Sequence, residues 1–323
     1  MSGSKSRPLW RSILGYCIKL TIGALLLWFV ARRVPLDEAF AALATVSSWL
    51  WVLTLVIIGV VLALGAWRWH LTSLRSIPMR TCLAYAWIGH FYATVLPGAV
   101  VGDVAKAAAL ATSDAKHRNM VLPVSVFLDR LLGLISLLLV LVVALVAMGG
   151  EKRGLHPALL AMGTGLIVAV LVLTPQIIGG ALLLARKLHF LPHAVIHGLD
   201  RIHFVIRQVG VKQWSFMLVL SLGIHALGGV IFVAAAREFG MSIEAWRLAL
   251  YYVAIGVVVM LPVTIAGIGA REQVSVWILG ASAGTATVPV ALSWFLLVTR
   301  VVHAVIGGLV QLTGWIRAGK KAR

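Results

Sequence analysis

The sequence contains few charged residues and very few acidic ones. Of its 323 residues 12% are charged, only 10 are Asp or Glu, and 61% are hydrophobic. A soluble globular chain is about 25% charged and about 45–50% apolar. This composition excludes a soluble enzyme, a disordered regulator and a disulfide-stabilised secreted domain, and it indicates a polytopic membrane protein.

The chain also lacks the residue patterns of common catalytic and metal centres. Its two cysteines, Cys17 and Cys82, both lie in apolar stretches, which favours small buried side chains. The sequence has no P-loop, no Gly-x-Ser-x-Gly element, no Ser–His–Asp set and no metal-ligand spacing. We therefore expect no catalytic residue, no cofactor and no metal.

Long apolar runs are what the chain has instead. A helix needs about 20 apolar residues to cross the hydrocarbon core of a bilayer. We predict an all-α membrane protein with six full transmembrane helices, at about 12–31, 48–67, 120–149, 156–178, 213–236 and 288–316.

The excess of cations predicts how these helices are oriented. A net charge of +18 can indicate a nucleic-acid partner, but the cations lie in short loops and not on a folded basic face, so we expect none. With the N-terminus inside, cytoplasmic loops hold 18 of the 28 Lys and Arg residues, Arg68 among them, and external loops hold six. This bias predicts that both termini are cytoplasmic.

Two further apolar runs, 81–102 and 248–270, are interrupted by proline and glycine. Backbone that is broken at membrane depth needs protein or a water-filled cavity to satisfy its hydrogen bonds. We therefore predict two re-entrant broken-helix hairpins. The residues expected to shape them are Pro97, Gly98, Gly102, Pro262, Gly267 and Gly269.

The two hairpins share one sequence pattern, Leu-Pro-x4-Gly-x2-Ala followed by Lys or Arg. It runs from Leu96 to Lys106 and again from Leu261 to Arg271, an offset of 165 residues. Three full spans separate the hairpins, and an odd number of spans inverts their orientation. Inverted repeats with broken helices are typical of transporters.

These repeats define the domain organisation that we expect. A single transmembrane domain covers residues 12–316, with repeat one at about 12–149 and repeat two at about 155–316. An N-terminal tail, 1–11, and a basic C-terminal tail, 317–323, flank it.

Seven ionisable residues lie in or beside the apolar segments, where charge is costly and marks a functional site by default. They are Asp103, Lys106, Asp129, Arg130, Arg271, Glu272 and Arg300. One hypothesis is that they bind substrate along the path of a lipid headgroup, because Lys, Arg and helix N-termini bind phosphate. The alternative is that Asp103–Lys106, Asp129–Arg130 and Glu272–Arg300 are internal ion pairs that hold the hairpins in the bundle.

Other polar and small residues in the apolar runs have simpler interpretations. We interpret His90, His225 and His303 as core histidines with satisfied hydrogen bonds. The pairs Gly228-Gly229 and Gly307-Gly308 are interpreted as allowing close helix packing.

Three motifs of the chain resemble those of a known family. They are Leu96-Pro97-Gly98-x3-Gly102-Asp103-x2-Lys106, Phe127-Leu128-Asp129-Arg130-Leu131-Leu132-Gly133 and Ala266-Gly267-Ile268-Gly269-Ala270-Arg271-Glu272. Over about residues 10–316 the chain resembles the lysylphosphatidylglycerol synthase transmembrane family, which includes the N-terminal flippase domain of the multiple peptide resistance factor. The resemblance implies a bacterial inner-membrane protein that moves polar lipids, such as aminoacylated phosphatidylglycerol, hopanoids or polyprenyl-linked sugars, between leaflets.

Together these observations predict a flippase-like translocator of a polar or anionic lipid. We expect it not to be an enzyme, since the 323 residues hold no aminoacyltransferase segment. Two alternatives stay open, namely a non-catalytic membrane accessory of a cell-envelope lipid or glycan pathway and a membrane enzyme acting on a lipid-linked substrate. Membrane lipids are the expected partners, and a homodimer or an envelope enzyme as partner is left open.

Overall fold

The computed structural model describes most of the chain. The described residues are 21, 28, 36–95, 102–103, 107–108, 110, 121–152, 200, 204, 207–260 and 267–321. The expected spans at 12–31 and 156–178 therefore lie outside them, apart from Thr21 and Trp28. The same holds for four residues that were singled out above, Pro97, Gly98, Lys106 and Pro262.

Within these residues the structure is all-helical: it forms eight helices and contains no strand. The helices are α2 (Leu36–Ala44), α3 (Ser48–Thr72), α4 (Met79–Val95), α6 (Val121–Lys152), α9 (Val211–Glu238), α10 (Ala245–Met260), α11 (Ala270–Ala283) and α12 (Thr287–Lys321). The all-α prediction is confirmed for this part of the chain.

Four of these helices are long and apolar enough to cross a membrane, and they match four of the six expected spans. They comprise Ser48–Thr72, Leu122–Val140, Lys212–Glu238 and Thr287–Thr313. Two boundaries differ from the prediction. Helix α3 continues past Trp67 to Thr72, which places Arg68 inside a helix and not in a loop, and α12 continues into the predicted tail as far as Lys321.

The exposed surface of α3 shows how such a helix meets its surroundings. Of the 18 consecutive residues of α3 with the highest hydropathy, only 17% are buried. The side chains of Trp49, Val52, Val56 and Val60 are exposed. A helix that is apolar on all sides is either buried in a core or surrounded by lipid. Because α3 is largely uncovered by protein, its apolar face is suited to lipid.

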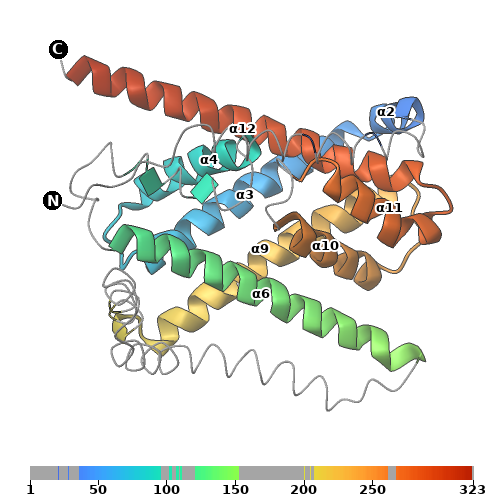
Figure 1. The fold of residues 1–323 in the computed structure, drawn as a ribbon, viewed down its shortest axis with the longest axis horizontal. Helices are drawn as coiled ribbons and strands as arrows, with labels where there is room; N and C mark the ends of the chain where they lie inside the picture. The colour runs from blue at the N-terminus through green and yellow to red at the C-terminus, as the bar shows by residue number, and fades with distance from the viewer. Residues whose placement is uncertain are drawn as a thin grey trace.

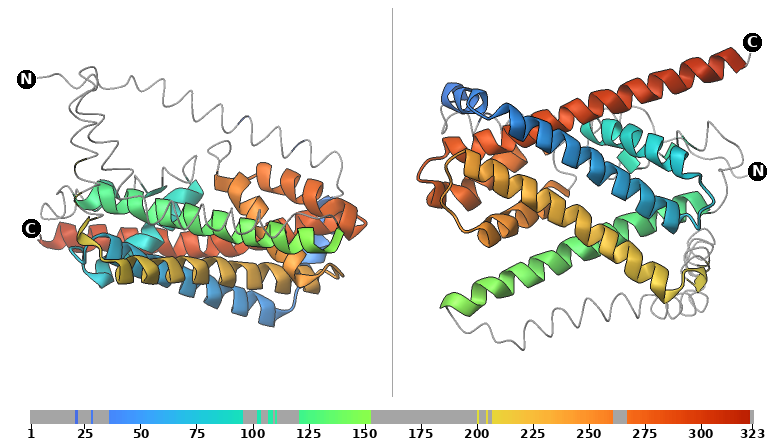
Figure 2. Two further views of the ribbon diagram at one scale, coloured as in Figure 1. Left: turned by 90° about the horizontal axis from the view of Figure 1, so that it is seen from below. Right: turned by 180° about the vertical axis from the view of Figure 1, so that it is seen from behind.

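Each half of the chain contains a long helix, then a short one, then another long one, and in the second half α11 lies between the last two. Helices α3, α4 and α6 begin 163, 166 and 166 residues before α9, α10 and α12, respectively. Helices α3 and α9 lie side by side, while α12 crosses α3 and α6 crosses α9 at an angle (Figures 1 and 2). The short helices pack across the halves, α4 against α12 and α10 against α6.

Both short helices precede a stretch in which the sequence predicts a break. Helix α4 comprises the 17 residues Met79–Val95 and α10 the 16 residues Ala245–Met260, and the predicted breaks at 96–101 and 261–266 lie outside the described residues. A turn at Gly267–Gly269 then leads into α11. Gly267 and Gly269 have φ of +78° and +82°, a left-handed conformation that glycine adopts without the steric cost of a Cβ.

Two of the apolar clusters among the described residues each join several helices. One joins α9, α10, α11 and α12 through Phe232, Leu248, Leu279 and Phe295. The other joins α3, α4 and α6 around Trp69, whose indole Nε1–H donates to Ser125 Oγ at 3.1 Å. Cys82 is buried in this second cluster as predicted, whereas Cys17 lies outside the described residues.

Candidate functional site

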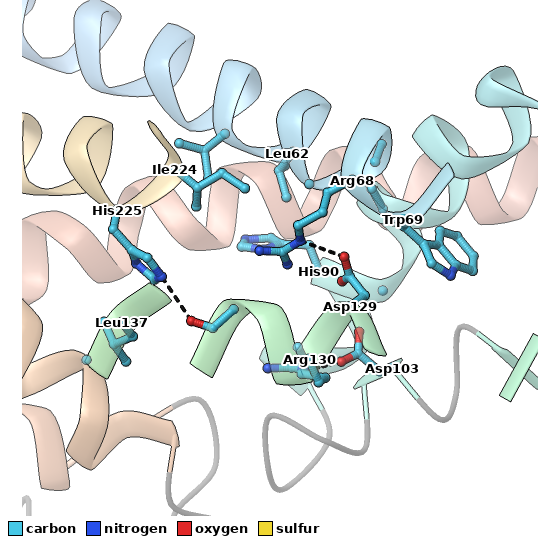
Figure 3. A pocket seen from close by; sticks show the side chains of 18 of the residues that line it. Leu62, Arg68, Trp69, His90, Asp103, Asp129, Arg130, Leu137, Ile224 and His225 are labelled. Carbon is cyan, nitrogen blue, oxygen red and sulfur yellow. Dashed lines mark hydrogen bonds and ion pairs between the residues drawn. The ribbon is translucent and has the colours of Figure 1, made fainter. Parts of the chain in front are cut away.

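Charged side chains meet in a cavity of about 390 Å³ (Figure 3). Its lining comes from α3, α4, α6, α9, α10 and α12, together with Asp103 and Gly267. Ligand pockets commonly enclose about 300–1,000 Å³, so this cavity is large enough for a small polar group. Between the charges its walls are apolar or small, formed by Val61, Leu62, Gly65, Ala66, Ala86, Gly89, Ala93, Leu137 and Ile224.

The first charged pair in the cavity joins α3 to α6. Arg68 Nε lies 2.7 Å from Asp129 Oδ1, and the two side chains are only 10% and 14% exposed. Arg68 Nη1 also donates to Ser221 Oγ on α9 at 2.8 Å. One guanidinium therefore ties three of the four long helices together beside the cavity.

Sequence reasoning missed Arg68 because the predicted span stopped at Trp67. A signal was present in the sequence, since Arg68 stands between Trp67 and Trp69 in a stretch that remains apolar to Leu71. Aromatic residues on both sides of a cation are compatible with a continuing helix as well as with a membrane boundary. The helical continuation is what the structure has.

A second charged pair joins α6 to the segment that follows α4. Arg130 Nε donates to Asp103 Oδ2. Successive residues of a helix point about 100° apart, so Asp129 and Arg130 face different partners and not each other. The absence of a side chain at Gly102 lets the backbone beside Asp103 lie close to α4, because a Cβ on Gly102 would lie 2.6 Å from the Cβ of Ala93.

Arg300 on α12 is the third cation of the cavity and differs from the other two. Its Nε–H donates to Thr94 Oγ1 at 3.3 Å and its Nη2 to the Ala93 carbonyl at 3.4 Å, both on α4. In the described part of the chain no carboxylate forms an ion pair with Arg300.

Arg271 and Glu272 form a separate buried network at the start of α11. Glu272 Oε2 accepts from the Gly269 backbone N–H at 2.7 Å, which caps the helix. Glu272 Oε1 accepts from Arg271 Nη2 at 3.1 Å and from Ser293 Oγ at 2.8 Å, and Arg271 Nε donates to the same Ser293 Oγ at 2.7 Å. Neither Arg271 nor Glu272 lines the cavity.

The structure thus divides the seven predicted site residues. Four of them line the cavity, namely Asp103, Asp129, Arg130 and Arg300. Arg271 and Glu272 join α11 to α12, and Lys106 lies outside the described residues. The pairings also differ from the proposed internal ones, since Asp129 pairs with Arg68 and Glu272 pairs with Arg271.

The three histidines all bond to backbone carbonyl groups. His90 Nε2–H donates to the Arg300 carbonyl at 3.3 Å, and His225 Nε2–H donates to that of Gly133 at 3.2 Å; both rings line the cavity. His303 lies against the carbonyls of Thr299 and Leu55 at 2.9 and 3.1 Å. Among the described residues, no three His, Cys, Asp or Glu side chains gather as a metal ion would require.

Apolar spanning helices around a cavity lined by charged side chains define a multi-pass helical membrane protein with a polar site between its helices. The family model described as the lysylphosphatidylglycerol synthase TM region matches residues 16–309, and the chain belongs to this family. None of the curated proteins matches the chain. Membership confirms the family resemblance and connects the protein with membrane lipids.

Proposed function

We propose that the protein is a flippase-like translocator that binds the headgroup of a polar or anionic lipid in this cavity and carries it between leaflets. Arg300 is the observation that carries the proposal. It is a cation on the wall of the cavity, its hydrogen bonds reach only neutral acceptors, and no described carboxylate pairs with it. Guanidinium groups bind phosphate through two parallel hydrogen bonds.

The two Arg–Asp pairs have a supporting role in this proposal. Arg68 and Arg130 each meet an aspartate, so their charges are stabilised whether or not a lipid is present. A bound phosphate would accept hydrogen bonds from Arg300 while the pairs hold α3, α6 and α9 around it. Lipid tails would stay outside, against the apolar helix faces.

Alternating access would come from movement of one half of the chain against the other. The matching order of helices, and the packing of each short helix on the long helix of the other half, support an inverted repeat. The proposed re-entrant hairpins would consist of α4 and α10 together with the segments that follow them, where the sequence has Leu96-Pro97-Gly98 and Leu261-Pro262. Transporters with this architecture bind substrate where broken helices of the two repeats meet.

The proposed location is the bacterial inner membrane with both termini in the cytoplasm. Placing Arg68 inside α3 leaves 17 cations in the predicted cytoplasmic loops against six outside, so the positive-inside bias remains. Ser76, which is exposed after α3, would then be cytoplasmic. A Ser76→Cys variant should react with a membrane-impermeant maleimide in inside-out vesicles and not in intact cells.

Reconstitution into liposomes tests the proposed activity. Vesicles that contain the protein should expose a fluorescent phospholipid to an external quencher faster than empty vesicles do. Arg300→Gln should lose this acceleration, whereas Arg247→Gln should keep it, because Arg247 pairs with Glu244 away from the cavity. Equal rates for the wild type and empty vesicles, for several polar lipids, would overturn the proposal.

A further inference from the structure

We propose that the cavity selects lipids by the net charge of the headgroup. It accepts a phosphodiester headgroup that carries one net negative charge and an uncharged polyol or sugar, and it disfavours zwitterionic and cationic aminoacyl headgroups. The inference rests on the proposed function, since it names the substrate class of the same site. The family description names lysylphosphatidylglycerol, whereas the inference predicts that this chain disfavours a lysyl headgroup.

The charges that line the cavity do not balance. Three arginines and two aspartates contribute to the wall in the described part of the chain. Asp129 is bound by Arg68 and Asp103 by Arg130, so both carboxylates are already engaged. With neutral histidines the described lining therefore carries one net positive charge, located at Arg300.

The rest of the chain offers almost no carboxylate that could neutralise Arg300. Only 10 residues are acidic, and the side chains of all of them except Asp114 and Glu151 lie in the described part. Glu272 is held by Arg271, Glu244 by Arg247, and Glu238 accepts from the Ser47 backbone N–H at 2.9 Å. Apart from Asp103 and Asp129, no described acidic residue lines the cavity.

An uncompensated charge among apolar walls gives the headgroup's charge a large influence on binding. A charge in a poorly solvated site is costly unless a partner of opposite sign neutralises it. A monoanionic headgroup would bring the lining to neutrality, and a zwitterion would leave the excess charge in place. A lysyl headgroup would add charge of the same sign, and its ammonium groups would find both aspartates already occupied by arginines.

The other polar groups of the lining fit a hydroxylated headgroup. Tyr252 on α10 reaches the cavity, and so do the rings of His90 and His225. All three are neutral groups that form ordinary hydrogen bonds with hydroxyls. None of them supplies the negative charge that an ammonium group needs.

A lipid competition measured by native mass spectrometry tests the inference. The purified full-length protein would be equilibrated with equal amounts of phosphatidylglycerol, phosphatidylethanolamine and lysylphosphatidylglycerol with the same acyl chains. We expect the wild type to retain phosphatidylglycerol over each of the other two by about tenfold or more. Arg300→Gln should lose this preference, Arg300→Lys should keep most of it, and Arg247→Gln should behave as the wild type.

The outcomes separate the two proposals. Retention of lysylphosphatidylglycerol as strongly as phosphatidylglycerol by the wild type would overturn the charge selectivity and leave lipid transport standing. An unchanged preference in a folded Arg300→Gln variant would do the same. Failure of the wild type to retain any of the three lipids would overturn the proposed function and the inference with it.

Discussion

Arg68 on α3 and Asp129 on α6 form an ion pair with 2.7 Å between Nε and Oδ1, although 61 residues separate them in the sequence. Both side chains are almost removed from solvent, and Ser221 on α9 accepts a further hydrogen bond from Arg68. The pair therefore fixes the relative positions of three spanning helices at the edge of the cavity. Its charges can be tested independently of any lipid.

Asp129→Asn should destabilise the folded protein strongly. The substitution leaves the Arg68 guanidinium buried without its counter-charge, and loss of one partner of a buried pair costs about 3–5 kcal/mol. Thermal unfolding of the purified variant in detergent measures the loss. The matched control is Glu244→Gln, which breaks the more exposed Glu244–Arg247 pair and should cost at most about 1 kcal/mol. Equal shifts for both variants would contradict a structural role for the Arg68–Asp129 pair.

Glu272→Gln should lower stability without changing lipid preference. The carboxylate accepts hydrogen bonds from three groups, the Gly269 backbone N–H, Arg271 and Ser293. An amide keeps one acceptor oxygen and loses the charge, and hydrogen bonds to charged groups contribute about 1.5–3 kcal/mol each.

Two measurements on Glu272→Gln are needed together. Thermal unfolding should show the loss of stability, and the lipid competition should give the wild-type ratio because Glu272 does not line the cavity. A changed lipid ratio in a stable variant would return Glu272 to the headgroup path that the sequence suggested.

Gly307→Ala should weaken the contact between α12 and α4. A Cβ at this position would lie 2.1 Å from the backbone oxygen of Trp87, so the two helices must move apart. Forcing extra atoms into a packed interface costs about 1–3 kcal/mol. Gly308→Ala is the control, since its Cβ would first meet the Phe91 side chain, at 3.3 Å. We expect a clearly lower melting temperature for Gly307→Ala than for Gly308→Ala, and the reverse order would contradict the described packing.

The four described spans could be predicted from the sequence because they depend on local composition. Apolar length defines α3, α6, α9 and α12, whereas the breaks predicted at Pro97 and Pro262 lie outside the described residues. The pairing of charges could not be predicted this way, because it depends on how helices are rotated and packed. Asp129 and Arg130 are neighbours in sequence, yet each finds its partner on another segment.

The same limit explains why Arg68 was missed and why the packing of Arg271 on α12 was not predicted. A hydropathy boundary cannot tell a cation at the membrane surface from one that turns inward to meet a carboxylate. For Arg271, the neighbouring Glu272 and the distant Ser293 complete a network that only the packing of α11 on α12 creates. The family motifs locate the charged residues but not their partners.

Gly228→Ala should reduce the occupancy of the cavity without changing its charge preference. A Cβ on Gly228 would lie 2.0 Å from the Tyr252 hydroxyl oxygen and 2.5 Å from its Cζ, so the tyrosine ring must move. Tyr252 packs against Phe232 at a centroid distance of 5.9 Å and lines the cavity, so we expect the displaced ring to move into the cavity. All three lipids of the competition should therefore be retained less, in unchanged proportion.

The neighbouring position supplies the control for this last substitution. Gly229→Ala would bring a Cβ no closer than 3.9 Å to Tyr252, an ordinary contact, and should retain lipid as the wild type does. Adding Tyr252→Phe to Gly228→Ala removes the closest contact and should restore part of the retention. If Gly228→Ala instead alters the ratio of phosphatidylglycerol to lysylphosphatidylglycerol, Tyr252 contributes to headgroup selection and Arg300 does not act alone. If Gly228→Ala retains as much lipid as the wild type, lipid does not occupy the space beside Tyr252.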